Sequence, residues 1–341
     1  MPKLKNRKIV LASRPTGEAT ADNFQVIETE EPDRLDSGVL LKTLWLSLDP
    51  YMRGRMSESK SYAVPVGIGE VMVGGTVSQV LASKLDDFAA GDFVVGYTGW
   101  QEYARSDGTG LRKLNPNLAP ISTALGILGM TGMTAYTGLL NIGQPKPGET
   151  LVVAAATGAV GSVVGQIAKL KGCRVVGIAG GDRKVRYLTE ELGFEAGLNH
   201  YASDFAARLR KACPKGVDIY FENVGGNVWD AVFPLLNQFA RVPVCGLIAH
   251  YNDQSLPAGP NRTPELMRAI LVKRLTLHGF IVSDFAAQTP DFLRDVGDWA
   301  RDGKLRYRED VVVGLEKAPA AFIGLLKGHN FGKLLVKVAE A

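Results

Sequence analysis

The chain has 341 residues, more than a single domain usually holds, so two domains are expected. Hydrophobic residues make up 46% of it and charged residues 22%, which excludes a largely disordered chain. The formal net charge is only +4 and the basic residues are dispersed, which argues against nucleic acid as a main partner. No apolar run approaches the roughly 18 residues of a membrane span, so no membrane partner is expected either.

The N-terminus and the cysteines indicate a cytoplasmic protein. The first apolar piece, residues 9–12, is too short for the hydrophobic region of a signal peptide. Cys173, Cys213 and Cys245 are far apart and odd in number, which suggests neither a disulfide framework nor a metal site. A reducing cytoplasm is therefore the expected compartment.

The hydrophobic pattern predicts a β-rich first segment and an alternating second one. Residues 1–124 have strand-like runs at 39–48, 71–81 and 93–97, separated by glycine-bearing turns. From Gly126 onward strands alternate with helices, which predicts a parallel sheet covered on both faces. Its strands are expected at 151–154, 174–179, 217–221 and 241–247.

The pattern changes again after about residue 304. A helix is expected from Pro319, ended by Gly328, and a closing strand is expected at 333–338. This tail is expected to return to the first domain. The predicted fold class is therefore α/β, with a doubly wound parallel-sheet domain at 125–304 inserted in a β-rich domain of residues 1–124 and 305–341.

A small-residue turn follows the run 151–154 and predicts a dinucleotide site. Residues 155–165 are Ala-Ala-Thr-Gly-Ala-Val-Gly-Ser-Val-Val-Gly, and they open a helix expected to continue to Lys171. Small residues let backbone N–H groups and the positive end of a helix approach a pyrophosphate. Ala156 replaces the first glycine of the usual pattern, and the alternative is that the glycines only allow close packing. The candidate contacts are Thr157, Gly158, Ala159, Val160 and Gly161.

The end of the run 174–179 favours NADPH over NADH. An NAD enzyme would place an acidic residue there for the ribose hydroxyls, whereas this chain has Ala179-Gly180-Gly181. These small residues leave room for a 2′-phosphate, which Arg183 or Lys184 could neutralise. Asp182 lies one or two positions late for the NAD role but is not excluded from it. Alternatively, Arg183 and Lys184 only form the solvated first turn of a helix running to Leu192.

Tyr251 and Tyr51 are the candidate catalytic residues. Tyr251 follows the strand expected to end in Cys245-Gly246, so it should emerge at the carboxyl edge of the sheet, where open α/β folds bind ligands. A phenol with a pKa of about 10 can donate to a developing negative charge on oxygen. The alternative is an aromatic wall that only packs on substrate. Tyr51, in a proline-bearing loop of the first domain, would contact substrate or pack within its loop.

Several segments in series resemble the zinc-independent double-bond reductases of the medium-chain dehydrogenase/reductase family. That branch includes the leukotriene hydroxydehydrogenase/prostaglandin reductases and the plant double-bond reductases. The resemblance covers essentially the whole chain and is carried by residues 48–54 (Leu-Asp-Pro-Tyr-Met-Arg-Gly), 129–136, 222–226 (Glu-Asn-Val-Gly-Gly), 245–252 and 328–333. Residues 212–220 and 322–328 are most similar to the bacterial NADPH-dependent curcumin reductases.

This resemblance implies the architecture and the chemistry. It implies a Rossmann NADPH-binding domain at 125–304 within a GroES-like catalytic domain, and a homodimer. Hydride from NADPH would reach the β-carbon of an α,β-unsaturated ketone or aldehyde, after which the α-carbon is protonated. Two other functions stay open: a zinc-free quinone reductase, and an NADPH-binding redox sensor with little turnover.

The resemblance also implies roles for particular residues. It assigns the 2′-phosphate to Lys184 and the preceding glycines, including Gly181, with His200 or Tyr201 in place of a tyrosine found in many relatives. Asn330 would lie beside the nicotinamide, unless it only caps the last helix. The other implied cofactor contacts are Met130, Thr131, Asn223, Val224, Gly225, Cys245, Gly246 and Tyr251.

No metal site is expected. Zinc-dependent relatives carry a Gly-His-Glu segment and several cysteines early in the chain. Here the corresponding segment is Gly67-Ile68-Gly69-Glu70, no cysteine precedes Cys173, and all four histidines lie after the first domain. Glu70 is therefore expected to be structural or an ordinary surface residue.

Overall fold

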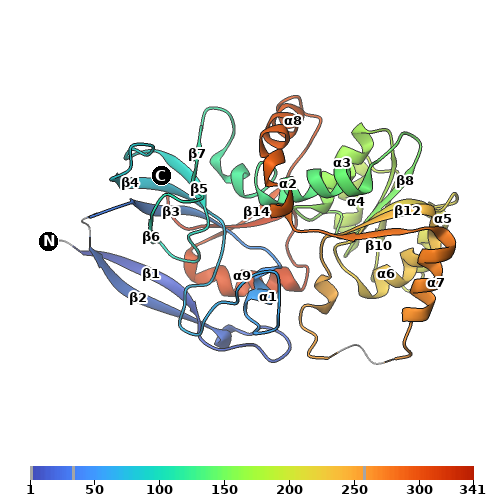
Figure 1. The fold of residues 1–341 in the computed structure, drawn as a ribbon, viewed down its shortest axis with the longest axis horizontal. Helices are drawn as coiled ribbons and strands as arrows, with labels where there is room; N and C mark the ends of the chain where they lie inside the picture. The colour runs from blue at the N-terminus through green and yellow to red at the C-terminus, as the bar shows by residue number, and fades with distance from the viewer. Residues whose placement is uncertain (1–2, 33–34, 256–258) are drawn as a thin grey trace. The chain divides into compact units, whose positions relative to one another are not determined.

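The computed structural model describes residues 3–32, 35–255 and 259–341, which form two compact units (Figure 1). Unit 1 holds Met1–Gly126 and Glu309–Ala341, and unit 2 holds Ile127–Arg308. Unit 2 is thus inserted into the sequence of unit 1, in agreement with the predicted fold class. The domain limits expected after residues 124 and 304 stay predictions.

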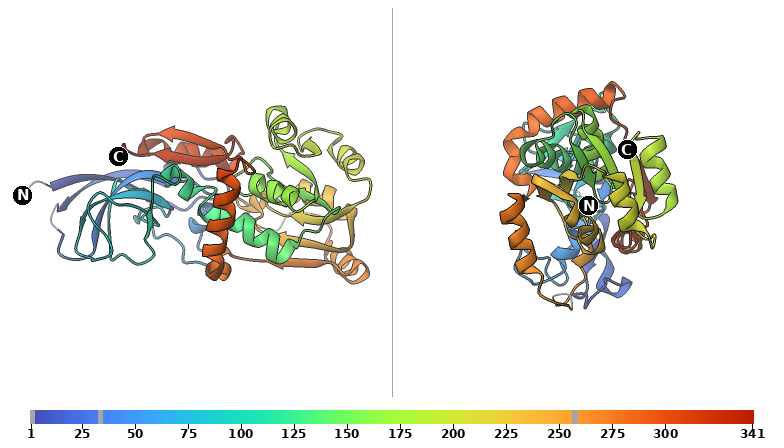
Figure 2. Two further views of the ribbon diagram at one scale, coloured as in Figure 1. Left: turned by 90° about the horizontal axis from the view of Figure 1, so that it is seen from above. Right: turned by 90° about the vertical axis from the view of Figure 1, so that its right-hand side faces the viewer.

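Unit 1 is built on a 7-stranded sheet in the order β14-β15-β3-β4-β5-β7, with β6 also paired to β3. Apart from the parallel pair β14 and β15, visible as two red strands near the C-terminus in Figure 2, the pairs are antiparallel. The strands are β3 (Val39–Ser47), β4 (Thr76–Ser83), β5 (Phe93–Gly96), β6 (Tyr103–Ser106), β7 (Arg112–Leu114), β14 (Glu309–Val313) and β15 (Lys333–Lys337). A separate antiparallel ribbon joins β1 (Lys3–Leu11) and β2 (Phe24–Pro32).

The C-terminal segment completes the core of unit 1. Phe322, on α9 (Ala318–Leu326), packs edge-on against the buried Trp100 with ring centroids 5.8 Å apart. Trp100 in turn stacks on Phe24 at 5.6 Å. Such aromatic contacts add to the apolar area that each ring buries. The predicted return of the tail to the first segment is therefore confirmed within unit 1.

Unit 2 contains a parallel 6-stranded sheet in the order β10-β9-β8-β11-β12-β13. The strands are β8 (Thr150–Val153), β9 (Arg174–Ala179), β10 (Ala196–Asn199), β11 (Val217–Phe221), β12 (Leu236–Val244) and β13 (Thr276–Gly279). The chain leaves β8 toward β9 on one side and later returns to β11 on the other. The crevice at such a reversal of strand order is where doubly wound sheets bind ligands.

Helices cover both faces of this sheet because its strands alternate apolar side chains between two cores. Leu151 and Val153 belong to one core, and Val152 and Ala154 to the other. The first core is closed by α2 (Met130–Thr137), α3 (Gly161–Leu170), α4 (Asp182–Glu190) and α8 (Thr289–Arg301). The second is closed by α5 (Phe205–Ala212), α6 (Gly226–Val232) and α7 (Thr263–Lys273). In the described part of the chain, no helix is both long and apolar enough to cross a membrane.

Two predicted strands differ from the structure by more than one residue at their ends, and one ribbon was missed. The strand expected at 71–81 is β4, which begins at Thr76 and ends at Ser83. The carbonyls of Gly74 and Gly75 accept the N–H groups of Gly99 (3.2 Å) and Ser47 (2.8 Å), outside the regular ladder of this strand. The strand expected at 241–247 is β12, which begins at Leu236 and ends at Val244. Phe239 has a φ of 61°, and the pairing of β12 with β11 shifts register between Leu236 and Arg241, so the first part of this strand is irregular. The β1–β2 ribbon was not predicted.

Candidate functional site

The turn between β8 and α3 brings backbone very close to the start of the helix. A Cβ on Gly161 would lie 2.4 Å from the carbonyl oxygen of Ala155, so only glycine fits there. Ala155 itself has a φ of 49°, an uncommon conformation for a residue with a side chain. The Ala156 N–H donates to the carbonyl of Ile178 (2.8 Å), and its methyl group lies where β9 has Gly177. The alanine in place of the first glycine is thus accommodated by the neighbouring strand.

The end of β9 forms a second, basic part of the site. Gly181 has a φ of 88°, and a Cβ there would meet nothing within 4 Å, so the backbone at this point faces open space. The rings of His200 and Tyr201 lie 4.1 Å apart beside Gly180. Burial and the charge of Lys184 lower the pKa of His200. Lys184, His200 and Tyr201 are therefore gathered around the glycines, and this group can receive an anion.

Asp182 is held by a residue that sequence analysis missed. The side-chain amide of Asn199, at the end of β10, donates to Asp182 Oδ1 at 3.0 Å. The side-chain oxygen of Asn199, Oδ1, accepts the N–H of Gly181 (3.1 Å) and of Tyr201 (3.0 Å). Asn199 thereby fixes the path of the glycine turn and engages the carboxylate of Asp182, the kind of group that an NAD enzyme directs at a ribose. An asparagine at a strand end was the only signal of this role.

The carboxyl ends of β11 and β12 form the third part of the site. The side-chain amide of Asn223 donates to the carbonyl of Ala154 at 2.9 Å, which joins this part to the β8–α3 turn. Val224 and Gly225 follow at the start of α6. The predicted residues thus follow neighbouring strands at the carboxyl edge of the sheet; they are residues 157–161, 181, 184, 200, 201 and 223–225.

Tyr251 also lies at this edge. It follows a short 3-10 helix (Ile248–His250) and is half-buried. A Cβ on Gly246 would be 3.0 Å from the Tyr251 hydroxyl. The hydroxyl therefore lies beside the start of the loop that follows β12. Burial and the charge of Glu222 raise the pKa of Cys245 to about 12, which keeps its thiol protonated and argues against a nucleophile.

The structure places Met130 and Thr131 at the first turn of α2, in unit 2. Thr131 is buried, and the Met130 carbonyl accepts the hydroxyl of Thr134 at 2.8 Å. Their contact with a cofactor stays a prediction.

Tyr51 and Asn330 belong to unit 1. Burial and the charge of Asp49 raise the pKa of Tyr51 far above its usual value, so the phenol keeps its proton. The Asn330 amide donates to the Gly332 carbonyl at 2.8 Å, within the turn between α9 and β15. Asn330 thus supports its own turn, and its place beside a nicotinamide stays a prediction. Arg53 donates to the Gly17 carbonyl (2.7 Å) as a loop anchor.

A buried ion pair holds the Tyr51 loop. Lys333 Nζ lies 2.7 Å from Asp49 Oδ1, and the two side chains are only 4% and 5% exposed. Lys333 also donates to the Leu48 carbonyl at 2.9 Å, and Ser47 donates to the second oxygen of Asp49. The loop that carries Tyr51 is therefore tied to β15, the strand that follows Asn330.

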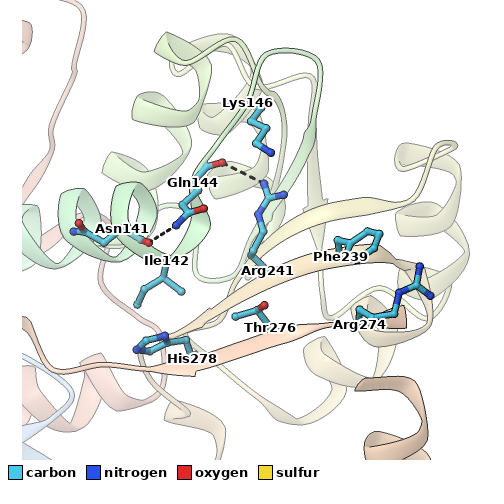
Figure 3. Close-up of a pocket in the computed structure, with 9 residues that line it drawn as sticks. All are labelled: Asn141, Ile142, Gln144, Lys146, Phe239, Arg241, Arg274, Thr276 and His278. Atoms are coloured by element: carbon cyan, nitrogen blue, oxygen red, sulfur yellow. Dashed lines mark hydrogen bonds between the residues drawn. The ribbon is translucent and has the colours of Figure 1, made fainter. Parts of the chain in front are cut away.

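A pocket of about 330 Å³ in unit 2 lies apart from these residues (Figure 3). It is lined by Asn141, Ile142, Gln144, Lys146, Phe239, Arg241, Arg274, Thr276 and His278. Several of these polar groups already have partners: Arg241 pairs with Glu149 at 2.5 Å, and Gln144 donates to the Asn141 carbonyl at 3.0 Å. None of the lining residues belongs to the predicted site, so the pocket is not part of it.

Within the described residues, no group of three or more His, Cys, Asp or Glu side chains is placed to hold a metal ion. Glu70, at the position of the zinc-ligand segment, accepts the N–H of Gly67 at 2.8 Å. Its role in the structure is thus to close a turn.

Comparison with known proteins gives matches along the whole chain. Residues 7–114 match a model described as the N-terminal domain of oxidoreductase, and residues 159–297 match one described as zinc-binding dehydrogenase. The NADPH-dependent curcumin reductase of Escherichia coli is 57% identical over 99% of this chain and 98% of its own. Prostaglandin reductase 1 of Rattus norvegicus is 45% identical, with 94% and 95% covered. A crystal structure of CurA from Vibrio vulnificus in complex with NADPH superimposes with a TM-score of 0.96 at 56% identity, covering 98% of this chain and all of that one.

Proposed function

This chain belongs to the zinc-independent branch of the medium-chain dehydrogenase/reductase family that contains the curcumin and prostaglandin reductases, and we propose that it reduces the C=C bond of α,β-unsaturated ketones and aldehydes with NADPH. The observation that carries this proposal is the place of Tyr251. Its phenol lies at the same sheet edge as the dinucleotide turn. Cys173, Cys213 and Cys245 are free thiols, which supports the cytoplasm as part of the proposal.

The residues present fit NADPH. Gly161 in the turn at Ala155–Gly161 has no room for a side chain, which leaves the backbone at the start of α3 open to a pyrophosphate. The open space at Gly181, with Lys184 and His200 beside it, suits a 2′-phosphate. When bound, NADPH would supply the hydride for the β-carbon of the substrate.

The protein's own contribution is orientation and charge stabilisation. As the β-carbon is reduced, negative charge develops on the carbonyl oxygen, and a fixed donor there lowers the barrier. Tyr251 O–H is the donor in this proposal. Asn223 and the turn after it hold the cofactor side of the site, because the Asn223 amide is itself anchored to Ala154. A proton then reaches the α-carbon, which completes the reduction.

A substrate screen tests the proposed reaction. NADPH oxidation is followed at 340 nm with enones, enals, quinones and secondary alcohols as separate substrates. We expect turnover of enones and enals, with the saturated carbonyl compound as product. Turnover of quinones alone would favour the quinone reductase, and binding of NADPH without turnover of any substrate would favour a sensor.

Lys184→Ala tests the assignment of the 2′-phosphate. Because a charge-assisted contact is lost, NADPH affinity should fall by roughly 1 to 3 kcal/mol, while NADH affinity should hardly change. Arg186→Ala is the matched control, since it removes a positive charge from the exposed side of the same helix, α4. Both affinities are measured by titrating nicotinamide fluorescence. An equal loss for NADPH and NADH in Lys184→Ala would contradict the assignment.

We further propose that the protein is a homodimer with symmetric contacts through unit 2. β13 is the terminal strand of the parallel sheet, and most of its residues are exposed. Nearby α7 has no buried residue and exposes Met267, Leu271 and Val272, the last two by 76% and 57%. An exposed edge strand beside an apolar helix face is suited to a second copy in two-fold symmetry.

Light scattering at micromolar concentration should therefore give two copies of the 36.6 kDa chain. Leu271→Glu combined with Val272→Glu should shift the mass to one copy, because two charges would be buried in the contact. Leu118→Glu is the matched control, since Leu118 is 83% exposed but lies in unit 1. A monomeric parent protein would refute the dimer.

A further inference from the structure

Three consecutive backbone N–H groups between β11 and α6 are bound by two side chains. Val224 and Gly225 donate to the same oxygen of Glu222, Oε1, at 2.6 and 2.9 Å. Gly226 donates to His250 Nε2 at 3.2 Å. Successive N–H groups of this kind commonly bind an external anion. Here the chain's own carboxylate and imidazole occupy them, so these two side chains determine the path of the turn at 223–226.

Glu222 connects the ends of two strands. Its side chain is buried and also accepts the hydroxyl of Tyr220 at 2.9 Å, while its other oxygen, Oε2, has no hydrogen-bond partner among the described residues. Its main-chain carbonyl accepts the N–H of Cys245 (2.9 Å) and of Gly246 (3.2 Å). Burying a carboxyl group costs free energy unless hydrogen bonds compensate it. Through these bonds Glu222 holds both the loop after β11 and the loop after β12.

His250 connects the turn to the segment that carries Tyr251. Because Nε2 accepts from Gly226, the ring proton must lie on Nδ1, which is 2.8 Å from Asp253 Oδ2. The ring also packs on Gly225, where a Cβ would lie 2.9 Å from His250 Cδ2. Two backbone bonds reinforce the connection, from Ile248 N–H to Asn223 O (3.3 Å) and from Ala249 N–H to Val224 O (2.9 Å).

We infer that Glu222 and His250 are positioning residues that hold the turn at 223–226 and Tyr251 in one fixed arrangement. Neither group needs to touch substrate. Loss of either should therefore move the cofactor turn and the phenol together, which affects NADPH binding and turnover in the same variant. This inference rests on the proposed function, because it takes Tyr251 as the donor.

The test uses paired variants of the full chain. Glu222→Ala removes the shared acceptor, whereas Glu222→Gln retains an oxygen for both N–H groups. His250→Phe keeps a ring but removes the acceptor and the Asp253 contact, and His250→Gln returns an acceptor. Because the His250 side chain is 37% exposed, its variants are expected to fold even where Glu222→Ala does not. Glu195→Ala is the matched control: that carboxylate accepts the Val175 N–H at 2.7 Å where β9 begins, away from the site.

We expect Glu222→Ala and His250→Phe to lower kcat for an enone at saturating NADPH, and to raise the NADPH dissociation constant, each by roughly tenfold to a hundredfold. Glu222→Gln and His250→Gln should recover most of both losses, and Glu195→Ala should leave both values within twofold. If both kcat and the NADPH dissociation constant of His250→Phe stayed within twofold of the parent values, the inference would be overturned. If the parent reduced no enone, the proposed function would fail, but the NADPH dissociation constants would still decide the role of Glu222 and His250.

Discussion

Tyr251→Phe is expected to lower kcat for an enone by roughly tenfold to a thousandfold, while NADPH affinity stays near that of the parent. The substitution keeps the ring and its packing against Gly246 and removes only the O–H donor. A donor to the developing oxyanion acts in the transition state, so its loss appears in kcat rather than in cofactor binding. The measurement is steady-state kinetics with an enone, with direct titration of NADPH.

Tyr136→Phe is the matched control for this change. The Tyr136 hydroxyl donates to Asp295 Oδ2 at 2.7 Å, between α2 and α8, so this variant also loses one phenolic hydrogen bond in unit 2. It should lose some stability and keep its kcat. A Tyr251→Phe enzyme with unchanged kcat, under conditions where hydride transfer limits the rate, would reject the donor role.

Lys333→Met should destabilise unit 1 by about 3 to 5 kcal/mol, because it leaves the carboxylate of Asp49 buried without its cation. The Leu48 carbonyl would lose a hydrogen bond as well. The free energy of unfolding is measured by urea denaturation, followed by tryptophan fluorescence. The loop that carries Tyr51 is tied to β15 by this pair, so the variant should also show weaker binding of substrate if Tyr51 contacts it.

Two further variants separate the buried charge from other effects. Replacing both partners, as in Lys333→Met with Asp49→Leu, should restore much of the lost stability, since no unpaired charge remains. Lys337→Met breaks the pair with Glu340, whose side chain is 83% exposed, and should cost less than about 1 kcal/mol. Equal losses for Lys333→Met and Lys337→Met would show that burial of the pair does not govern its effect.

Some elements could be predicted with accurate limits. The runs 174–179 and 217–221 coincide with β9 and β11, because each is a mostly apolar run that begins after a turn and forms a buried parallel strand. The predicted start of β12 was too late, because the first part of the strand pairs irregularly with β11 around Phe239, whose φ is positive. The helix expected from Pro319 begins at Ala318, one residue earlier, since proline suits the first turn of a helix.

The residues of the candidate site also divide into those that the sequence could predict and those that it could not. The small-residue turn after β8, Lys184 and Tyr251 could be chosen from the sequence, because strand ends and glycines are visible in it. The roles of Asp182, Glu222 and His250 could not be, since each depends on a partner supplied by another part of the chain. Asp182 is engaged by Asn199, and Glu222 and His250 bind the N–H groups of one turn.

By itself, therefore, the sequence determined the fold class, the inserted parallel-sheet domain and the position of the small-residue turn between β8 and α3. These features follow from apolar periodicity and from residues with small or absent side chains, which act over a few neighbouring positions. Only the tertiary structure decided which polar side chains hold the backbone around the candidate site. That choice depends on strand order and register, which place β9 beside β10 and β11 beside β12 and so bring together donors and acceptors that are distant in the chain.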